Sequence, residues 1–87
     1  MNTRNQAKEH RFNKDDIGRW VIIQRPKYNR DTVQRLFLVD REKTKAWWWS
    51  PNTDYAKRYD SQIDAELQVK RYKYGKIKAV QITYRML

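Results

Sequence analysis

The stretch RWVIIQR at residues 19–25 decides the fold, because it combines β-branched and aromatic residues and stops at Pro26. This composition is typical of a β-strand, and proline borders strands because it has no backbone N–H to donate. Polar residues and turn formers follow at 26–31, and the residues TVQRLFLV at 32–39 predict a second strand.

Two further strands are predicted downstream. The residues KAWWWS at 45–50 follow a turn at 40–44 and end at Pro51, and the residues IKAVQITY at 77–84 form the last strand. The first three strands are joined by short polar loops, which favours an antiparallel meander.

The segment at 62–74 fits two structures. Its apolar residues alternate at period two, as in a half-buried strand: Ile63, Ala65, Leu67 and Val69. The same segment is rich in helix formers, and SQID at 61–64 is similar to a capping box. As a helix, it would carry Ile63 and Leu67 on one face and Ala65 and Val69 nearly opposite. Gly75 stands where a helix stop is expected, so we predict a helix and keep the strand as the alternative.

The predicted fold is α+β, a small antiparallel sheet with one helix packed on one face. Its order is strand, strand, strand, helix, strand, within a single domain at residues 17–87. Residues 1–16 are almost wholly polar, with Phe12 the only sizeable apolar side chain besides Met1. We expect them to form a flexible tail, because such a segment cannot bury enough apolar surface to become ordered.

Part of the chain resembles small phage and prophage accessory proteins, most of them uncharacterised. The resemblance spans roughly residues 19–82 and rests on WWS at 48–50, DYAKRYDS at 54–61 and DA at 64–65. The triple tryptophan and the Tyr/Lys-rich end of the helix depart from the usual pattern. The class includes inhibitors of host machinery such as anti-CRISPR proteins, so the resemblance implies a phage-encoded protein that acts in the host cytoplasm.

The resemblance also implies roles for four residues. Ser61 would cap the helix, and Tyr59 would staple it to the sheet. Ala56 and Ala65 would permit close packing.

Charge is the strongest functional signal. The chain has 20 Lys and Arg against 10 Asp and Glu, a net charge of +10, and its isoelectric point is near 10.1. A domain with an isoelectric point above about 9 has the electrostatic character of a nucleic-acid binder. We therefore expect a polyanionic partner, either nucleic acid (DNA or RNA) or a host nucleoprotein.

The residue types disfavour catalysis and metal binding. There is no cysteine, and the only histidine is His10, in the expected tail, so a zinc site has no ligand set. Neither Gly18 nor Gly75 belongs to a phosphate-binding loop motif. We expect no enzyme activity, no cofactor and no metal. Because the sequence carries no signal-like or membrane-length apolar run, we expect no membrane association and a cytoplasmic location.

Two groups of residues are predicted to bind nucleic acid. In both, cations suited to phosphates are interleaved with tyrosines suited to stacking on bases. The C-terminal group consists of Lys70, Arg71, Tyr72, Lys73, Tyr74 and Lys76. The group on the first hairpin consists of Arg25, Lys27, Tyr28 and Arg30. The alternative for the first group is charge that complements a helix C-terminus, with tyrosines packed on the sheet. For the second, it is ordinary solubility charge on a loop.

The tryptophan triplet cannot be wholly buried, because alternation along a strand sends Trp48 to one face and Trp47 and Trp49 to the other. We predict that Trp48 faces the core and that Trp47 and Trp49 form a partner-binding face. The alternative is the reverse, with Trp48 exposed.

The favoured function is non-enzymatic binding of nucleic acid or a nucleoprotein. The alternative is a protein-directed, anti-CRISPR-like inhibitor of a host enzyme or defence system, anchored by tryptophan and steered by charge. A third possibility is a homo-oligomeric structural protein, since the sequence leaves the oligomeric state open.

Overall fold

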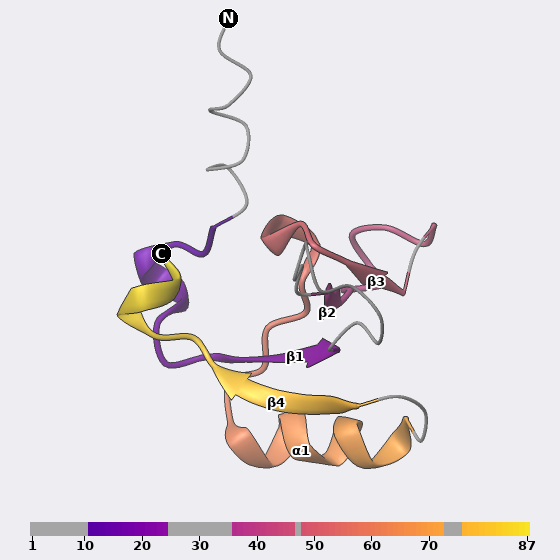
Figure 1. The fold of residues 1–87 in the computed structure, drawn as a ribbon. Helices are drawn as coiled ribbons and strands as arrows, with labels where there is room; N and C mark the ends of the chain where they lie inside the picture. Colours follow the sequence, from indigo (N-terminus) through magenta and orange to yellow (C-terminus); the bar gives the residue numbers. More distant parts are fainter. Residues whose placement is uncertain (1–10, 25–35, 47, 73–75) are drawn as a thin grey trace, which may run out of the picture.

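An antiparallel sheet of four strands organises the computed structural model, which describes residues 11–24, 36–46, 48–72 and 76–87. The order across the sheet is β3-β2-β1-β4 (Figure 1). The strands are β1 (Trp20–Gln24), β2 (Leu36–Leu38), β3 (Trp49–Ser50) and β4 (Ile77–Gln81), and the helix α1 is Gln62–Arg71. The predicted α+β fold, with its order of strand, strand, strand, helix, strand, is confirmed.

β1 lies inside the sheet, between β2 and β4. It pairs with β4 along its whole length, from Trp20 opposite Gln81 to Gln24 opposite Ile77, and with β2 at its C-terminal end. Its three central residues, 21–23, are buried, as expected for a β-branched run with both faces covered. Successive side chains point to opposite faces, so β1 supplies apolar groups to both sides of the sheet.

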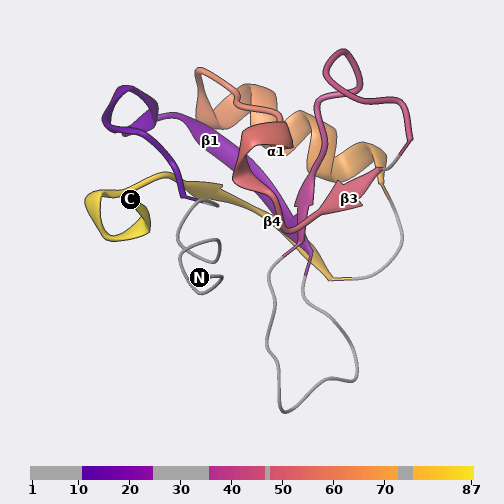
Figure 2. The same ribbon diagram turned by 90° about the horizontal axis from the view of Figure 1, so that it is seen from above.

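α1 packs on one face of β1 and β4 (Figures 1 and 2). The Ser61 hydroxyl accepts the backbone N–H of Asp64 at 3.2 Å, which satisfies one of the donors left open at a helix N-terminus. Ala65 is fully buried, so a small side chain lets the helix approach the sheet closely. The opposite face of the helix is open, since Ile63 is 73% exposed and Leu67 is 56% exposed.

The helix ends three residues earlier than predicted. Its last residue is Arg71, and Tyr72 already has extended backbone angles (φ −99°, ψ 111°). The choice of helix over strand is confirmed, whereas the predicted end at residue 74 is not, and 73–75 lie outside the described residues.

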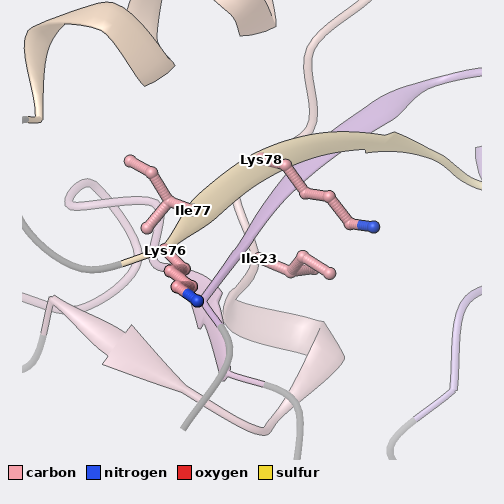
Figure 3. Close-up of a pocket in the computed structure, with 4 residues that line it drawn as sticks. All are labelled: Ile23, Lys76, Ile77 and Lys78. Atoms are coloured by element: carbon pink, nitrogen blue, oxygen red, sulfur yellow. The ribbon is translucent and has the colours of Figure 1, made fainter. Parts of the chain in front are cut away.

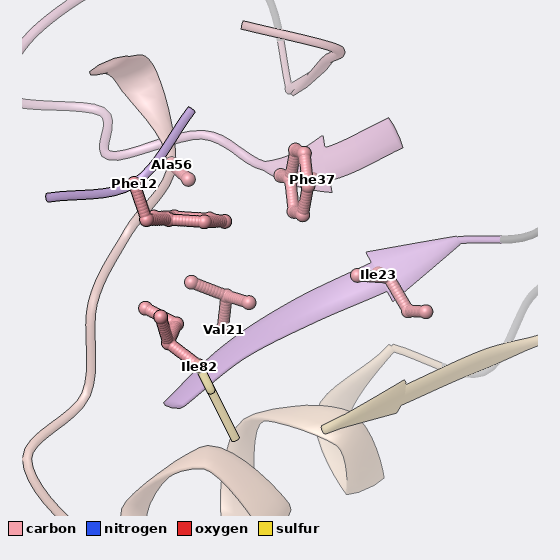
Figure 4. Close-up of a cluster of buried hydrophobic side chains, with 6 residues drawn as sticks. All are labelled: Phe12, Val21, Ile23, Phe37, Ala56 and Ile82. Carbon is pink, nitrogen blue, oxygen red and sulfur yellow. The ribbon is translucent and has the colours of Figure 1, made fainter. Parts of the chain in front are cut away.

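A cluster of buried apolar side chains covers the face of the sheet opposite α1 (Figure 4). Its members are Phe12, Val21, Ile23, Phe37, Ala56 and Ile82. The rings of Phe12 and Phe37 meet edge to face, with centroids 5.4 Å apart, a favoured aromatic arrangement.

Because Phe12 belongs to this cluster, the folded domain begins before residue 17, the start expected from the sequence. Residues 11–16 were predicted to belong to a flexible tail, but Phe12 and Asp16 are buried. Asp16 bonds to Arg58, and Gly18 has φ 94°, a backbone angle that favours glycine, where the chain turns towards β1. The domain thus includes residues 11–16, while residues 1–10 lie outside the described part.

Within the described residues, each strand is shorter than its predicted range. β3 contains two residues of the predicted 45–50, and β4 stops at Gln81, before a 3-10 turn at Tyr84–Met86. β2 is described from Leu36, and the rest of its predicted range, 32–35, lies outside the described residues. No helix in the described part of the chain has the length and apolar character needed to cross a membrane.

Candidate nucleic-acid interface

Four exposed cations flank the end of the sheet where α1 stops and β4 begins. Lys70 and Arg71 form the last turn of α1, and Lys76 and Lys78 lie at the start of β4. We call this set the basic end. From Leu67 to the last residue the sequence contains no Asp or Glu, so no acid of this segment offsets the charge. The ion pairs Arg19–Asp60 and Arg58–Asp16, both between described residues, include no residue of the basic end.

The two halves of the basic end lie on different sides of the sheet. Lys78 pairs with Ile23, so its side chain shares the face that carries the buried cluster, opposite α1. Lys76 lies in the bend before β4 and Lys78 lies within β4, and their ammonium groups extend on the side away from the helix (Figure 3). With Ile23 and Ile77 they line a shallow hollow of about 220 Å³. Lys70 and Arg71 approach the same end from the helix side.

An aromatic pair adjoins the helix half of the basic end. Tyr72, directly after Arg71, meets Trp48 edge to face, with ring centroids 6.4 Å apart. The guanidinium of Arg41 lies 4.2 Å from the centroid of the Trp48 ring, at cation–π distance. Arg41, Trp48 and Tyr72 thus join the loop before β3 to the end of α1, and Figure 2 shows these segments on the same side of the molecule.

Tyr59 lies beside this group and is kept neutral. Burial, with smaller contributions from Tyr72 and Asp40, raises the pKa of Tyr59 to about 12. Its hydroxyl, which is protonated at neutral pH at the ordinary pKa of 10 as well, therefore stays protonated to more alkaline pH. The ammonium of Lys57 lies 6.0 Å from its ring centroid.

The tryptophan assignment made from the sequence is wrong for Trp48. Trp48 was expected in the core but is 49% exposed, whereas Trp49, expected on the open binding face, is half-buried. Trp49 pairs with Leu38, and Leu38 faces the opposite side of the sheet from its neighbour Phe37, which belongs to the buried cluster. Trp49 therefore points towards the face that α1 covers. The prediction was wrong about which face of the sheet the helix covers. The alternative given above, in which Trp48 is exposed, is the observed arrangement. Trp47 lies outside the described residues.

Of the predicted C-terminal group, the structure describes Lys70, Arg71, Tyr72 and Lys76 and brings them to one end of the sheet, with Tyr72 half-buried. Lys73 and Tyr74 lie outside the described residues. The predicted hairpin group lies outside them too: Arg25, Lys27, Tyr28 and Arg30. Tyr84 and Arg85, in contrast, lie beyond the other end of β4 (Figure 1).

Sequence reasoning missed Arg41 and misassigned Trp48. One signal was present: strands expected at 32–39 and 45–50 with a short turn between them form a hairpin, and its register determines which residues meet. The Val39 N–H donates to the Trp48 carbonyl at 2.9 Å, which brings the turn residue Arg41 close to Trp48. The predicted bounds, with a turn at 40–44, would have paired Val39 with Lys45 instead, so the contact follows only from the observed register.

The described residues contain no group of three or more His, Cys, Asp or Glu side chains placed to hold a metal ion. Compared with known protein families, with curated proteins and with solved structures, the chain matches none. Ser61 caps α1, and Ala56 and Ala65 are buried, but neither fact tests the resemblance to small phage proteins. Membership of that class stays a prediction.

Proposed function

We propose that this protein is a non-enzymatic nucleic-acid-binding protein whose basic end contacts the phosphates of free nucleic acid or of a nucleoprotein. The observation that carries the proposal is the gathering of Lys70, Arg71, Lys76 and Lys78 at one end of the sheet, exposed and outside the ion pairs of the described chain. Lysine and arginine release counterions when they neutralise phosphates, and this release drives association.

The competing explanation is local stabilisation of the helix. Lys70 and Arg71 lie at the negative end of the α1 dipole, where any cation stabilises a helix by about 0.3–1 kcal/mol. That explanation does not extend to Lys76 and Lys78, which lie just before and within β4, with their ammonium groups on the other side of the sheet. Two cationic pairs from different elements at one end therefore favour a shared ligand.

The experiment compares three double variants by fluorescence anisotropy with labelled oligonucleotides. Lys70→Gln with Arg71→Gln, and Lys76→Gln with Lys78→Gln, each remove two charges from the basic end. Lys14→Gln with Arg85→Gln removes two exposed charges from the 3-10 turns near the two chain ends, away from the start of β4 (Figure 1). All three lower the net charge equally, so they separate a local site from general attraction.

We expect the first two variants to bind more weakly than the wild type and the third to bind nearly as well. Equal losses of affinity in all three variants would show that only the net charge matters. Unchanged affinity in the first two variants would refute a site at the basic end.

A protein partner is the second candidate function, and the open face of α1 favours it. Ile63 and Leu67 are one helical turn apart and strongly exposed, which is uncommon for two large apolar side chains unless they have a partner. A protein-directed inhibitor would use this face and rely on the positive charge for steering. Replacing both residues with serine would then abolish capture of a protein after nuclease treatment and leave oligonucleotide binding unchanged.

The proposal includes the biological setting expected from the sequence, a phage-encoded accessory protein in the host cytoplasm. Its support is the resemblance of roughly residues 19–82 to that class, which rests on the motifs at 48–50, 54–61 and 64–65.

A further inference from the structure

Trp48 is held in a fixed environment although half of its surface is open. Arg41 lies 4.2 Å from its ring centroid and Tyr72 meets it edge to face at 6.4 Å, so two different elements fix its orientation. Yet Trp48 is 49% exposed and does not belong to the buried cluster. An indole ring that is held in place by neighbouring side chains and is also exposed to solvent can stack with another flat ring.

The surroundings of Trp48 indicate which kind of ring it would take. Tyr72 follows Arg71 in the chain, and Lys76 is four residues from Tyr72, at most about 14 Å away along a fully extended chain. A ligand on Trp48 is therefore close to cations of the basic end. The combination of a flat apolar ring and nearby negative charges is the chemistry of a nucleotide, whose base stacks while its phosphate pairs with a cation.

We propose that Trp48, with Tyr72 and Arg41, is a stacking site for the unpaired bases of a single-stranded nucleic acid. This inference rests on the proposed function and specifies its substrate class. In a duplex the base faces are covered by neighbouring base pairs, and cations alone reach the backbone. In a single strand the faces are free to stack on an aromatic ring or on a guanidinium plane. Trp48 supplies the aromatic ring and Arg41 the guanidinium plane, and the two lie against each other.

The test uses three probes of equal length, about 12 nucleotides. They are an oligothymidylate strand, its duplex with oligoadenylate, and an abasic strand that carries phosphates without bases. Trp48→Ala should weaken binding of oligothymidylate about five- to 150-fold, the usual effect of removing one stacking aromatic. It should leave binding of the abasic strand unchanged. Tyr84→Ala is the matched control, because Tyr84 is an exposed aromatic beyond the far end of β4, and it should change neither.

A second readout does not depend on the alanine variant folding. Stacking should quench the fluorescence of Trp48, and Trp48→Phe, which keeps an aromatic ring, should lose that part of the quenching while still binding oligothymidylate.

Three outcomes would overturn the inference while leaving the proposed function intact, provided that neutralising the basic end still weakens binding. These are an unchanged affinity of Trp48→Ala for oligothymidylate, an equal loss for the abasic strand, and unchanged quenching in Trp48→Phe. If the wild-type protein binds none of the three probes, the proposed function fails and the stacking site fails with it.

Discussion

Arg58 donates two hydrogen bonds to the carboxylate of Asp16, each 3.1 Å long, across 42 residues of sequence. The pair is nearly enclosed, since 12% of the Arg58 side chain and 9% of the Asp16 side chain are exposed. The third guanidinium nitrogen of Arg58, Nη1, donates to the carbonyl oxygens of Thr53 and Ala56, at 2.7 and 2.8 Å. The guanidinium also lies 5.0 Å from the Phe12 ring centroid, so one side chain ties the segment before β1 to the loop after β3.

We predict that Asp16→Asn destabilises the protein by about 3 kcal/mol. Removing one partner of a buried ion pair costs about 3–5 kcal/mol, and the lower end applies because Arg58 keeps its bonds to the carbonyl oxygens of Thr53 and Ala56. Urea unfolding followed by circular dichroism measures the change. The matched control is Asp15→Asn, the exposed neighbour, which should cost little. Equal, small changes in both variants would contradict a structural role for the pair.

The same pair predicts a dependence of stability on acid. Hydrogen bonds from Arg58, and a smaller one from the Asn13 N–H, lower the pKa of Asp16 below its ordinary value of 3.8. The stabilisation is therefore fully present above the unfolded pKa, near 3.8, and is lost as the pH falls through the lower folded value. The difference in unfolding free energy between the wild type and Asp16→Asn should shrink as the pH falls below that point. A difference that stays constant down to strongly acidic pH would show that the ionised carboxylate contributes nothing.

Phe12 tests whether residues 11–16 belong to the folded domain. Phe12→Ala should cost about 3–5 kcal/mol, the usual penalty for removing a buried aromatic side chain from a packed core. Phe12→Leu should cost clearly less, because it keeps much of the buried volume. Thermal unfolding of both variants provides the measurement. A loss of unfolding free energy below about 1 kcal/mol for Phe12→Ala would show that this segment belongs to the flexible tail expected from its composition.

Trp48 and Trp49 should separate stability from binding. Trp49→Ala should lower the free energy of unfolding more than Trp48→Ala, because Trp49 pairs with Leu38 in the sheet and Trp48 is half exposed. Trp48→Ala should instead be the one that weakens nucleic-acid binding. Melting temperature and anisotropy titration on both variants decide the order. The reverse order would restore the assignment expected from the sequence, with Trp48 in the core.

The sequence was sufficient for the elements that local chemistry determines. The β-branched run at 19–25 and the Ser61 cap predict a strand and a helix regardless of the rest of the chain, and both are present. The placement of Phe12 could not be predicted in this way, because it depends on Arg58 and Phe37, which are distant in sequence.

The same reasoning applies to the candidate site. The cations Lys70, Arg71 and Lys76 were recognised from charge and spacing alone, but their division between two sides of the sheet follows from the register of β4 with β1. Alternation predicted that Trp48 and Trp49 point in opposite directions. It could not say which face the helix covers, since that is decided by long-range packing.

The dependence of binding on salt tests the proposed function most directly. For a single strand, the slope of log K against log salt is about −0.7 for each phosphate contacted, so removing two contacts should reduce its magnitude by about 1.4. We predict this reduction for Lys76→Gln with Lys78→Gln and for Lys70→Gln with Arg71→Gln, and an unchanged slope for Lys14→Gln with Arg85→Gln. Identical slopes in all three variants and the wild type would contradict phosphate binding at the basic end.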